Sequence, residues 1–110
     1  MSSDLAVVYA RIGDLLERSH AEASSAALWS EVEDVLSDGY AHVLVLESRR
    51  LRHRQRAEDL AAQPHGAEQA GEIRSLLQLA ASTGEELRRL RSLLTSLRDH
   101  AGRTERAASA

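Results

Sequence analysis

The chain has 110 residues and a formal net charge of −3, and Ala, Leu, Arg and Glu supply 60 of the residues. It contains no Cys or Phe, and only 11 residues are Ile, Val or Thr, which excludes a disulfide framework, a thiolate metal site and an all-β fold. This composition is typical of long helices, and the 14 Arg without a single Lys indicate GC-rich bacterial codons.

The first expected helix covers residues 4–18. Its apolar residues recur at alternating spacings of three and four, which is the period of one helical face. They are Leu5, Val8, Ile12 and Leu15. Ser19 and Glu22 then have the spacing of a capping box for the next helix, and Ser24 and Ser25 are alternative starting points.

The second expected helix covers residues 22–62. Its apolar stripe alternates between spacings of three and four without a slip, as in a coiled coil. The stripe positions are Trp29, Val32, Leu36, Gly39, Val43, Leu46, Arg50, His53, Ala57 and Leu60. Ser37, Asp38 and Gly39 resemble a turn, so a break at Gly39 is the alternative. We favour one continuous helix, because the stripe keeps its phase and a helical Gly costs only about 1 kcal/mol.

Residues 63–66, which read Gln-Pro-His-Gly, form the expected turn. The third expected helix covers residues 67–102, and residues 103–110, rich in Ala and Ser, are expected to fray. Its stripe positions are Ile73, Leu76, Ala80, Thr83, Leu87, Leu90, Leu94, Leu97 and Ala101. A break at Gly84, with Ser82 and Glu85 as a capping box, is again the alternative.

These elements predict a single all-α domain over residues 1–106. It is an antiparallel, coiled-coil-like hairpin of two long helices, with the short N-terminal helix completing a three-helix bundle at one end. Folding about Pro64 places Gly39 opposite Leu90, and Arg50 opposite Leu79 and Ala80. The first helix is about 22 Å long against about 60 Å for each long helix. We therefore expect one side of the remaining hairpin, residues 43–60 and 69–87, to be uncovered.

Two polar residues, Arg50 and His53, interrupt the stripe in that uncovered half. A guanidinium in an apolar stripe is costly unless it reaches water or a carboxylate. Polar stripe residues often specify register or oligomeric state; a local error in the phase of the stripe is the alternative. We expect a second copy or a partner helix to fill this half and offer carboxylates to Arg50. The predicted partner-binding residues are Arg50, His53, Val43, Leu46, Ala57, Leu76 and Ala80.

Residues 48–56 read SRRLRHRQR and place Arg49, Arg52 and Arg56 on one outer stripe. Arginine forks suit phosphates, so the alternative function is a ligand-sensing regulator that binds a phosphate-bearing small molecule through these three residues. Nucleic acid is a less favoured partner, because acidic residues flank the run and no aromatic residue lies near it to stack on a base.

The sequence contains no nucleophile elbow, no phosphate-cradling Gly-rich loop and no repeated metal-ligand spacing. We therefore predict a protein without enzymatic activity, cofactor or metal: a small homo-oligomeric regulator or adaptor, with a homodimer as the expected assembly. No apolar run is long enough to span a membrane and the first residues lack a basic signal-peptide region, which predicts a cytoplasmic location.

Overall fold

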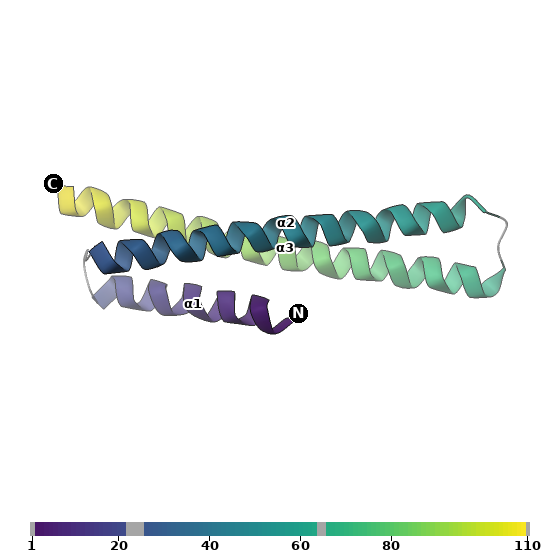
Figure 1. Ribbon diagram of the computed structural model, residues 1–110, viewed down its shortest axis with the longest axis horizontal. Coiled ribbons are helices and arrows are strands. Elements are labelled where there is room, and N and C mark those ends of the chain that lie inside the picture. The colour runs from purple at the N-terminus through teal and green to yellow at the C-terminus, as the bar shows by residue number, and fades with distance from the viewer. Residues whose placement is uncertain (1, 22–25, 64–65, 110) are drawn as a thin grey trace. The chain divides into compact units, whose positions relative to one another are not determined.

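The computed structural model describes residues 2–21, 26–63 and 66–109, with side chains in residues 5–18, 28–63 and 66–103. This part of the chain contains three helices and no strand: α1 (Ser2–Ala21), α2 (Ala26–Ala61) and α3 (Ala67–Ser109) (Figure 1). The two long helices pack closely against each other and the short α1 contacts both. The predicted all-α hairpin with a short third helix is confirmed.

Both long helices continue through their central glycines. α2 passes Gly39 and α3 passes Gly84 without interruption, so the alternative of a break at either glycine is wrong. α3 also extends to Ser109, beyond the predicted end at residue 102. Several predicted cap and turn elements lie outside the described part: the side chain of Ser19, and the residues Glu22, Ser24, Ser25, Pro64 and His65.

The start of α3 has a cap that the sequence analysis missed. The backbone N–H of Gly66 donates to the side-chain Oε1 of Gln69 at 3.2 Å, and the Gly66 carbonyl accepts from the N–H of Ala70 at 3.1 Å. A Gln three residues after the cap residue makes this half of a capping box. The cap therefore fixes where α3 begins.

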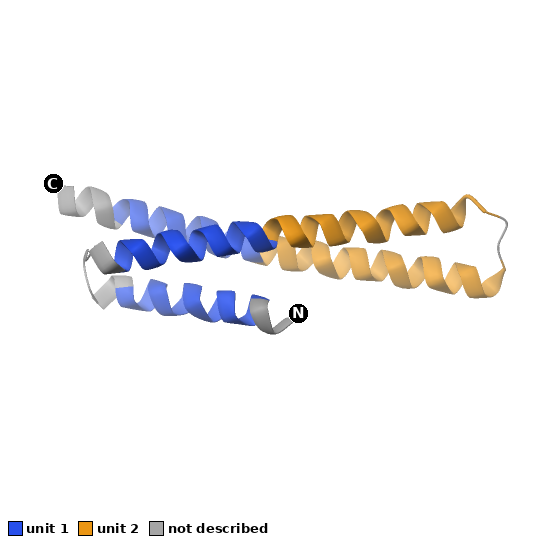
Figure 2. Cartoon of the chain, viewed as in Figure 1, with its two compact units in different colours: residues 1–42, 90–110 blue, residues 43–89 orange. Residues whose placement is uncertain are grey.

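The chain divides into two compact units, which share the two long helices (Figure 2). Unit 1 comprises residues 1–42 and 90–110, so it contains α1, the first part of α2 and the last part of α3. Unit 2 comprises residues 43–89, which form the rest of the hairpin.

Unit 1 is a three-helix bundle with an aliphatic core. Ile12 of α1 and Leu90 and Leu94 of α3 are completely buried. The remaining buried hydrophobic side chains are those of Val8, Leu15, Leu28, Val32, Val35, Leu97 and Ala101. Arg11 pairs with Asp38 and Arg18 with Glu31, so later residues of α1 meet earlier residues of α2 and the two helices run antiparallel.

The buried face of α2 in unit 1 differs from the predicted stripe. Leu28 and Val35 are buried, whereas the predicted core residues Trp29 and Leu36 are only half-buried. The physical reason is that α2 has to face two helices here. The ion pairs with α1 lie three residues after Leu28 and Val35, on the same side of α2. The buried face is therefore turned toward α1.

Gly39 allows α2 and α3 to approach closely in unit 1. A Cβ atom at Gly39 would overlap the side chain of Leu94, with Leu94 Cδ1 and Cγ only 3.1 and 3.2 Å away. The predicted neighbour was Leu90, one turn earlier. Leu94 reaches Gly39 because helical side chains lean toward the N-terminus of their own helix. The glycine therefore leaves the space that this leucine fills.

Candidate interaction surface

The apolar stripe of unit 2 is closed inside the hairpin. Its buried residues are Val43, Leu46, Ala57, Ala80, Thr83 and Leu87. Four of the predicted partner-binding residues, Val43, Leu46, Ala57 and Ala80, belong to this core, and Leu76 is half-buried. The expectation that this stripe lies on an open face is wrong, because α2 and α3 cover it with each other.

The side chain of Arg50 lies over Gly84. A Cβ atom at Gly84 would be 3.4 Å from Arg50 Cζ and Nε and 3.6 Å from Nη2. The predicted neighbours were Leu79 and Ala80, one turn closer to the start of α3. The long side chain reaches Gly84 because it leans toward the N-terminus of α2, which is level with later residues of α3. The guanidinium therefore packs over the backbone of Gly84 within the hairpin.

Arg50 and His53 each have a buried side-chain nitrogen that makes no hydrogen bond to the described residues. Arg50 and His53 are half-buried, and Arg50 Nε and His53 Nδ1 are buried without a hydrogen-bond partner among the described residues. A buried polar atom without a partner costs about 1–3 kcal/mol. These two unpaired nitrogen atoms therefore lower the stability of the hairpin. That a partner supplies a carboxylate that pairs with Arg50 stays a prediction.

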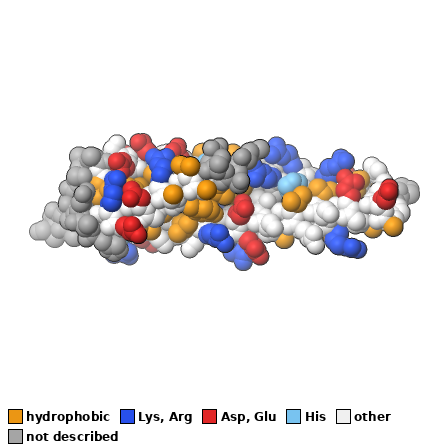
Figure 3. Space-filling view, turned by 90° about the horizontal axis from the view of Figure 1, so that it is seen from below, with side chains coloured by type: hydrophobic (Ala, Val, Ile, Leu, Met, Phe, Trp, Pro, Cys, Tyr) orange, Lys and Arg blue, Asp and Glu red, His pale blue; other side chains and the backbone are white. Residues whose placement is uncertain are grey.

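One side of the hairpin carries the arginines. Arg56 Nη2 lies 3.6 Å from Glu72 Oε1, which joins one edge of α2 to one edge of α3. Helical spacing from these two residues extends the same side over both helices. We call it the arginine side, and it consists of Val45, Arg49, Arg52, Arg56, Glu72 and Leu79. On the face shown in Figure 3, basic side chains, a histidine and hydrophobic side chains lie near one another.

The predicted anion-binding residues share that side but are not equally available. Arg52 is exposed, Arg49 is half-buried, and Arg56 faces the carboxylate of Glu72. An acidic residue within the same surface opposes the binding of a phosphate. The three arginines are therefore only partly suited to hold a phosphate group.

The opposite side of the hairpin carries exposed leucines. Leu44, Leu51 and Leu77 are 67%, 56% and 51% exposed. Leu44 and Leu51 each directly follow a stripe position of α2, and Leu77 lies seven residues before Gly84, the neighbour of Arg50. We call this the leucine side, and it consists of Leu44, Glu47, Leu51, Arg54, Glu58, Arg74, Leu77, Ala81 and Gly84.

The leucine side combines three exposed leucines with charged side chains. Five of the seven exposed large hydrophobic residues among the described side chains belong to unit 2, and three of them are these leucines. The apolar stripe does not include these leucines, because it runs only through the residues that close the hairpin. The signal was present in Leu44 and Leu51, which are seven residues apart and adjacent to that stripe.

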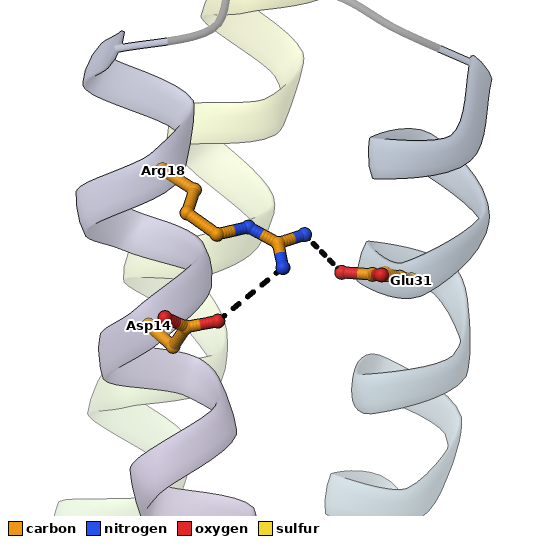
Figure 4. Close-up of polar contacts among 3 residues, drawn as sticks. All are labelled: Asp14, Arg18 and Glu31. Carbon is orange, nitrogen blue, oxygen red and sulfur yellow. Dashed lines mark hydrogen bonds and ion pairs between the residues drawn. The ribbon is translucent and has the colours of Figure 1, made fainter.

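A second candidate lies between α1 and α2 of unit 1. It is a hollow of about 230 Å³ lined by Arg11, Asp14, Leu15, Glu31 and Val35. Figure 4 shows the guanidinium of Arg18 between Asp14 and Glu31. Arg18 Nη1 lies 3.4 Å from Asp14 Oδ2, and Arg11 Nη1 lies 2.9 Å from Asp38 Oδ2. Each of these charged groups already has a partner of opposite sign on α1 or α2, so we assign the hollow to the packing of α1 against α2.

Comparisons with known proteins identify no relative of this chain. No family model matches the chain, and no curated protein or solved structure is significantly similar to it. None of the described helices contains a stretch long and apolar enough to cross a membrane. Within the described residues, no three metal-ligating side chains are grouped to hold an ion.

Proposed function

We propose that this chain is a non-enzymatic interaction module, a small regulator or adaptor, that binds a partner helix through the leucine side of unit 2. The observation that carries the proposal is the exposure of Leu44, Leu51 and Leu77, each by more than half, on one side of the hairpin. Burial of each leucine would contribute about 1.5 kcal/mol to binding. Three of them provide the apolar centre that a stable contact needs.

A helix is the partner that fits this arrangement. Leu44 and Leu51 are seven residues apart, about 10 Å along α2. Apolar side chains of an amphipathic helix recur at the same distance, so a partner helix lying along the hairpin would meet both leucines. Leu77 on α3 lies on the same side of the hairpin, so the same partner helix would also meet it.

A pair of neighbouring leucines provides a matched test. Leu77 and Leu79 are 51% and 50% exposed and lie two residues apart on α3, but on opposite sides of the hairpin. Each is replaced in turn by a photo-crosslinking benzoylphenylalanine in the cells that produce the protein. We expect a crosslinked product from position 77 and little from position 79. Equal products from both positions, or none from position 77, would contradict the proposal.

The alternative function, a regulator that binds a phosphate-bearing ligand through Arg49, Arg52 and Arg56, has weaker support because Glu72 occupies the same side. Its test is thermal unfolding with a panel of nucleotides. A rise in Tm that Arg52→Ala abolishes would favour the ligand-sensing function, whereas an unchanged Tm throughout the panel would count against it.

A further inference from the structure

We infer that the partner on the leucine side is a helix of a different protein that pairs an acidic residue with Arg50. This inference rests on the proposed function and adds the chemistry and the residue spacing of the partner. Two observations carry it: the Arg50 guanidinium lies among the exposed leucines, and it has no ion pair among the described residues.

The position of the Arg50 guanidinium follows from α2 and from Gly84. Arg50 directly precedes Leu51, and a long helical side chain leans by about one turn toward the N-terminus of its helix, which is the direction of Leu44. Arg50 Cζ and Nε lie 3.4 Å from the Cβ position of Gly84, which belongs to the leucine side. Leu77 lies on the same side of α3, two turns before Gly84. A helix that covers the three leucines therefore also covers this guanidinium.

The charge of Arg50 is not neutralised within the described part of the hairpin. Its Nε is buried without a hydrogen-bond partner, and no ion pair between described residues includes Arg50. The side chain is only half-buried, and its two Nη atoms are not among the buried unpaired atoms, so they face outward. Two guanidinium nitrogens in this position can hold a carboxylate through parallel hydrogen bonds.

A partner that covers Arg50 without a carboxylate would lose most of what it gains from the leucines. Removal of a guanidinium from water carries a penalty of the same order as the gain from burying three leucine side chains. A carboxylate at this point offsets the penalty, because an ion pair with good hydrogen bonds is strengthened when water is excluded. A positively charged residue there would add repulsion. The partner helix therefore needs an acidic residue where it passes over Arg50.

The spacing of the partner residues follows from the spacing on α2. Leu44 and Leu51 are seven residues apart, and the Arg50 guanidinium lies between their levels. The acidic residue of the partner therefore lies about three or four residues from each of the two apolar residues that meet these leucines. Such spacings return to one face of a helix, so a single amphipathic face presents the sequence apolar, acidic, apolar.

The other charges of the leucine side favour the same placement of the acidic residue. Arg54 lies one turn after Arg50, and Glu47 lies one turn before Arg50 and already has an interaction within the chain. An acidic residue that lies between Arg50 and Arg54 therefore faces two positive charges. With Arg50 included, this side carries three arginines and two acidic residues, so its net charge is positive.

A second copy of the chain fits this side poorly. The contact of Arg56 with Glu72 fixes the level of α2 relative to α3. Arg54 lies two residues before the first and Arg74 two residues after the second, so these two arginines lie at the same level. If α2 of one copy packed on α3 of another, Arg54 would meet Arg74 of the other copy, and the like charges would repel.

The first experiment uses three fluorescently labelled peptides that differ at one position. Each is a lactam-bridged amphipathic helix with two leucines seven residues apart, and the position midway between them is Glu, Gln or Lys. Fluorescence anisotropy measures their affinities for the full chain at concentrations up to about 1 mM. We expect the Glu peptide to bind about tenfold more tightly than the Gln peptide and the Lys peptide to bind most weakly. Equal affinities, or no binding by any of the three peptides, overturn the inference.

Arg50→Met and the matched control Arg52→Met test whether Arg50 is responsible. Methionine keeps most of the apolar length of the arginine side chain, and Arg52 is exposed on the arginine side of the same helix. Circular dichroism checks that both variants stay helical. Arg50→Met should make the Glu and Gln peptides bind equally, whereas Arg52→Met should leave the difference between them unchanged. A preference for Glu that survives Arg50→Met overturns the inference.

The crosslinking experiment at position 77 separates this inference from the proposed function. Arg50→Met should lower the yield of the crosslinked product about tenfold and Arg52→Met should not. If the product forms equally in both variants, the inference fails and the proposed function stands. A product that consists of two copies of this chain also overturns the inference. Absence of crosslinks at position 77 in the wild type contradicts the proposed function itself.

Discussion

Replacement of Gly39 by alanine affects stability in two opposite ways, through helix propensity and through packing of the core. Alanine favours a helix by about 1 kcal/mol over glycine. At Gly39 the new Cβ would overlap Leu94, which is completely buried and has little room to move. Overpacking of this kind costs about 1–3 kcal/mol. We expect Gly39→Ala to change the free energy of unfolding by between about zero and −2 kcal/mol.

Gly13→Ala is the matched control, because a Cβ atom at Gly13 meets nothing within 4 Å. It should gain the helix-forming contribution alone and raise stability by about 0.5–1 kcal/mol. Urea unfolding followed by circular dichroism, at one low protein concentration, compares the two variants. Gly39→Ala should be the less stable by about 1–3 kcal/mol, or about 4 °C in Tm per kcal/mol. Equal stabilisation by both substitutions would refute the close packing of Gly39 on Leu94.

Three further predictions concern the hairpin and the attachment of α1. Gly84→Ala should raise stability by about 0.5–1 kcal/mol in urea unfolding, because its Cβ would only touch the Arg50 guanidinium, at 3.4 Å; a loss would mean that the guanidinium needs the open glycine. Arg50→Met should raise the free energy of unfolding by up to about 1 kcal/mol, because methionine keeps the contact with Gly84 and removes the unpaired Nε, whereas Arg50→Ala should lower it by about 1 kcal/mol through the lost packing. Arg18→Met should lower stability by less than about 1 kcal/mol, because Arg18, Asp14 and Glu31 are all partly exposed; a larger loss in chemical unfolding would show that these ion pairs hold α1 in place.

Periodicity was sufficient to predict the buried face of α3. All nine of its predicted stripe positions are buried or half-buried, and the helix passes Gly84 as expected. The reason is that a single regular stripe, maintained over many turns, permits only one buried face. The same pattern also supported the continuity of α2 through Gly39.

Prediction was weaker where a helix meets two neighbours. The spacing of apolar residues around Trp29 and Leu36 does not show from which side α1 approaches α2. Because α1 packs on the side of Leu28 and Val35, those residues are buried instead. The observed neighbours of Arg50 and Gly39 also lie one turn away from those predicted, because simple pairing ignores the lean of the side chains.

The candidate surface was the part least accessible from the sequence. Val43, Leu46, Ala57 and Ala80 looked available because α1 is too short to cover the whole hairpin, yet a two-helix hairpin is able to bury its own stripe. Leu77 and Leu79 have the same residue type and almost the same exposure. Helical spacing places them on opposite sides of the α3 stripe, and the contact of Arg56 with Glu72 shows which residues of α2 share the side of Leu79.

The division of the chain has a consequence for how its length can vary. Unit 2 is one uninterrupted segment, residues 43–89, inserted between the two parts of unit 1. Removing seven residues from each arm of this segment would shorten both helices by two turns and leave the heptads in phase. Insertion of a heptad into each arm would lengthen them in the same way. The reach of the hairpin can therefore change in steps of about 10 Å, through paired insertions or deletions that do not touch the residues of the three-helix bundle.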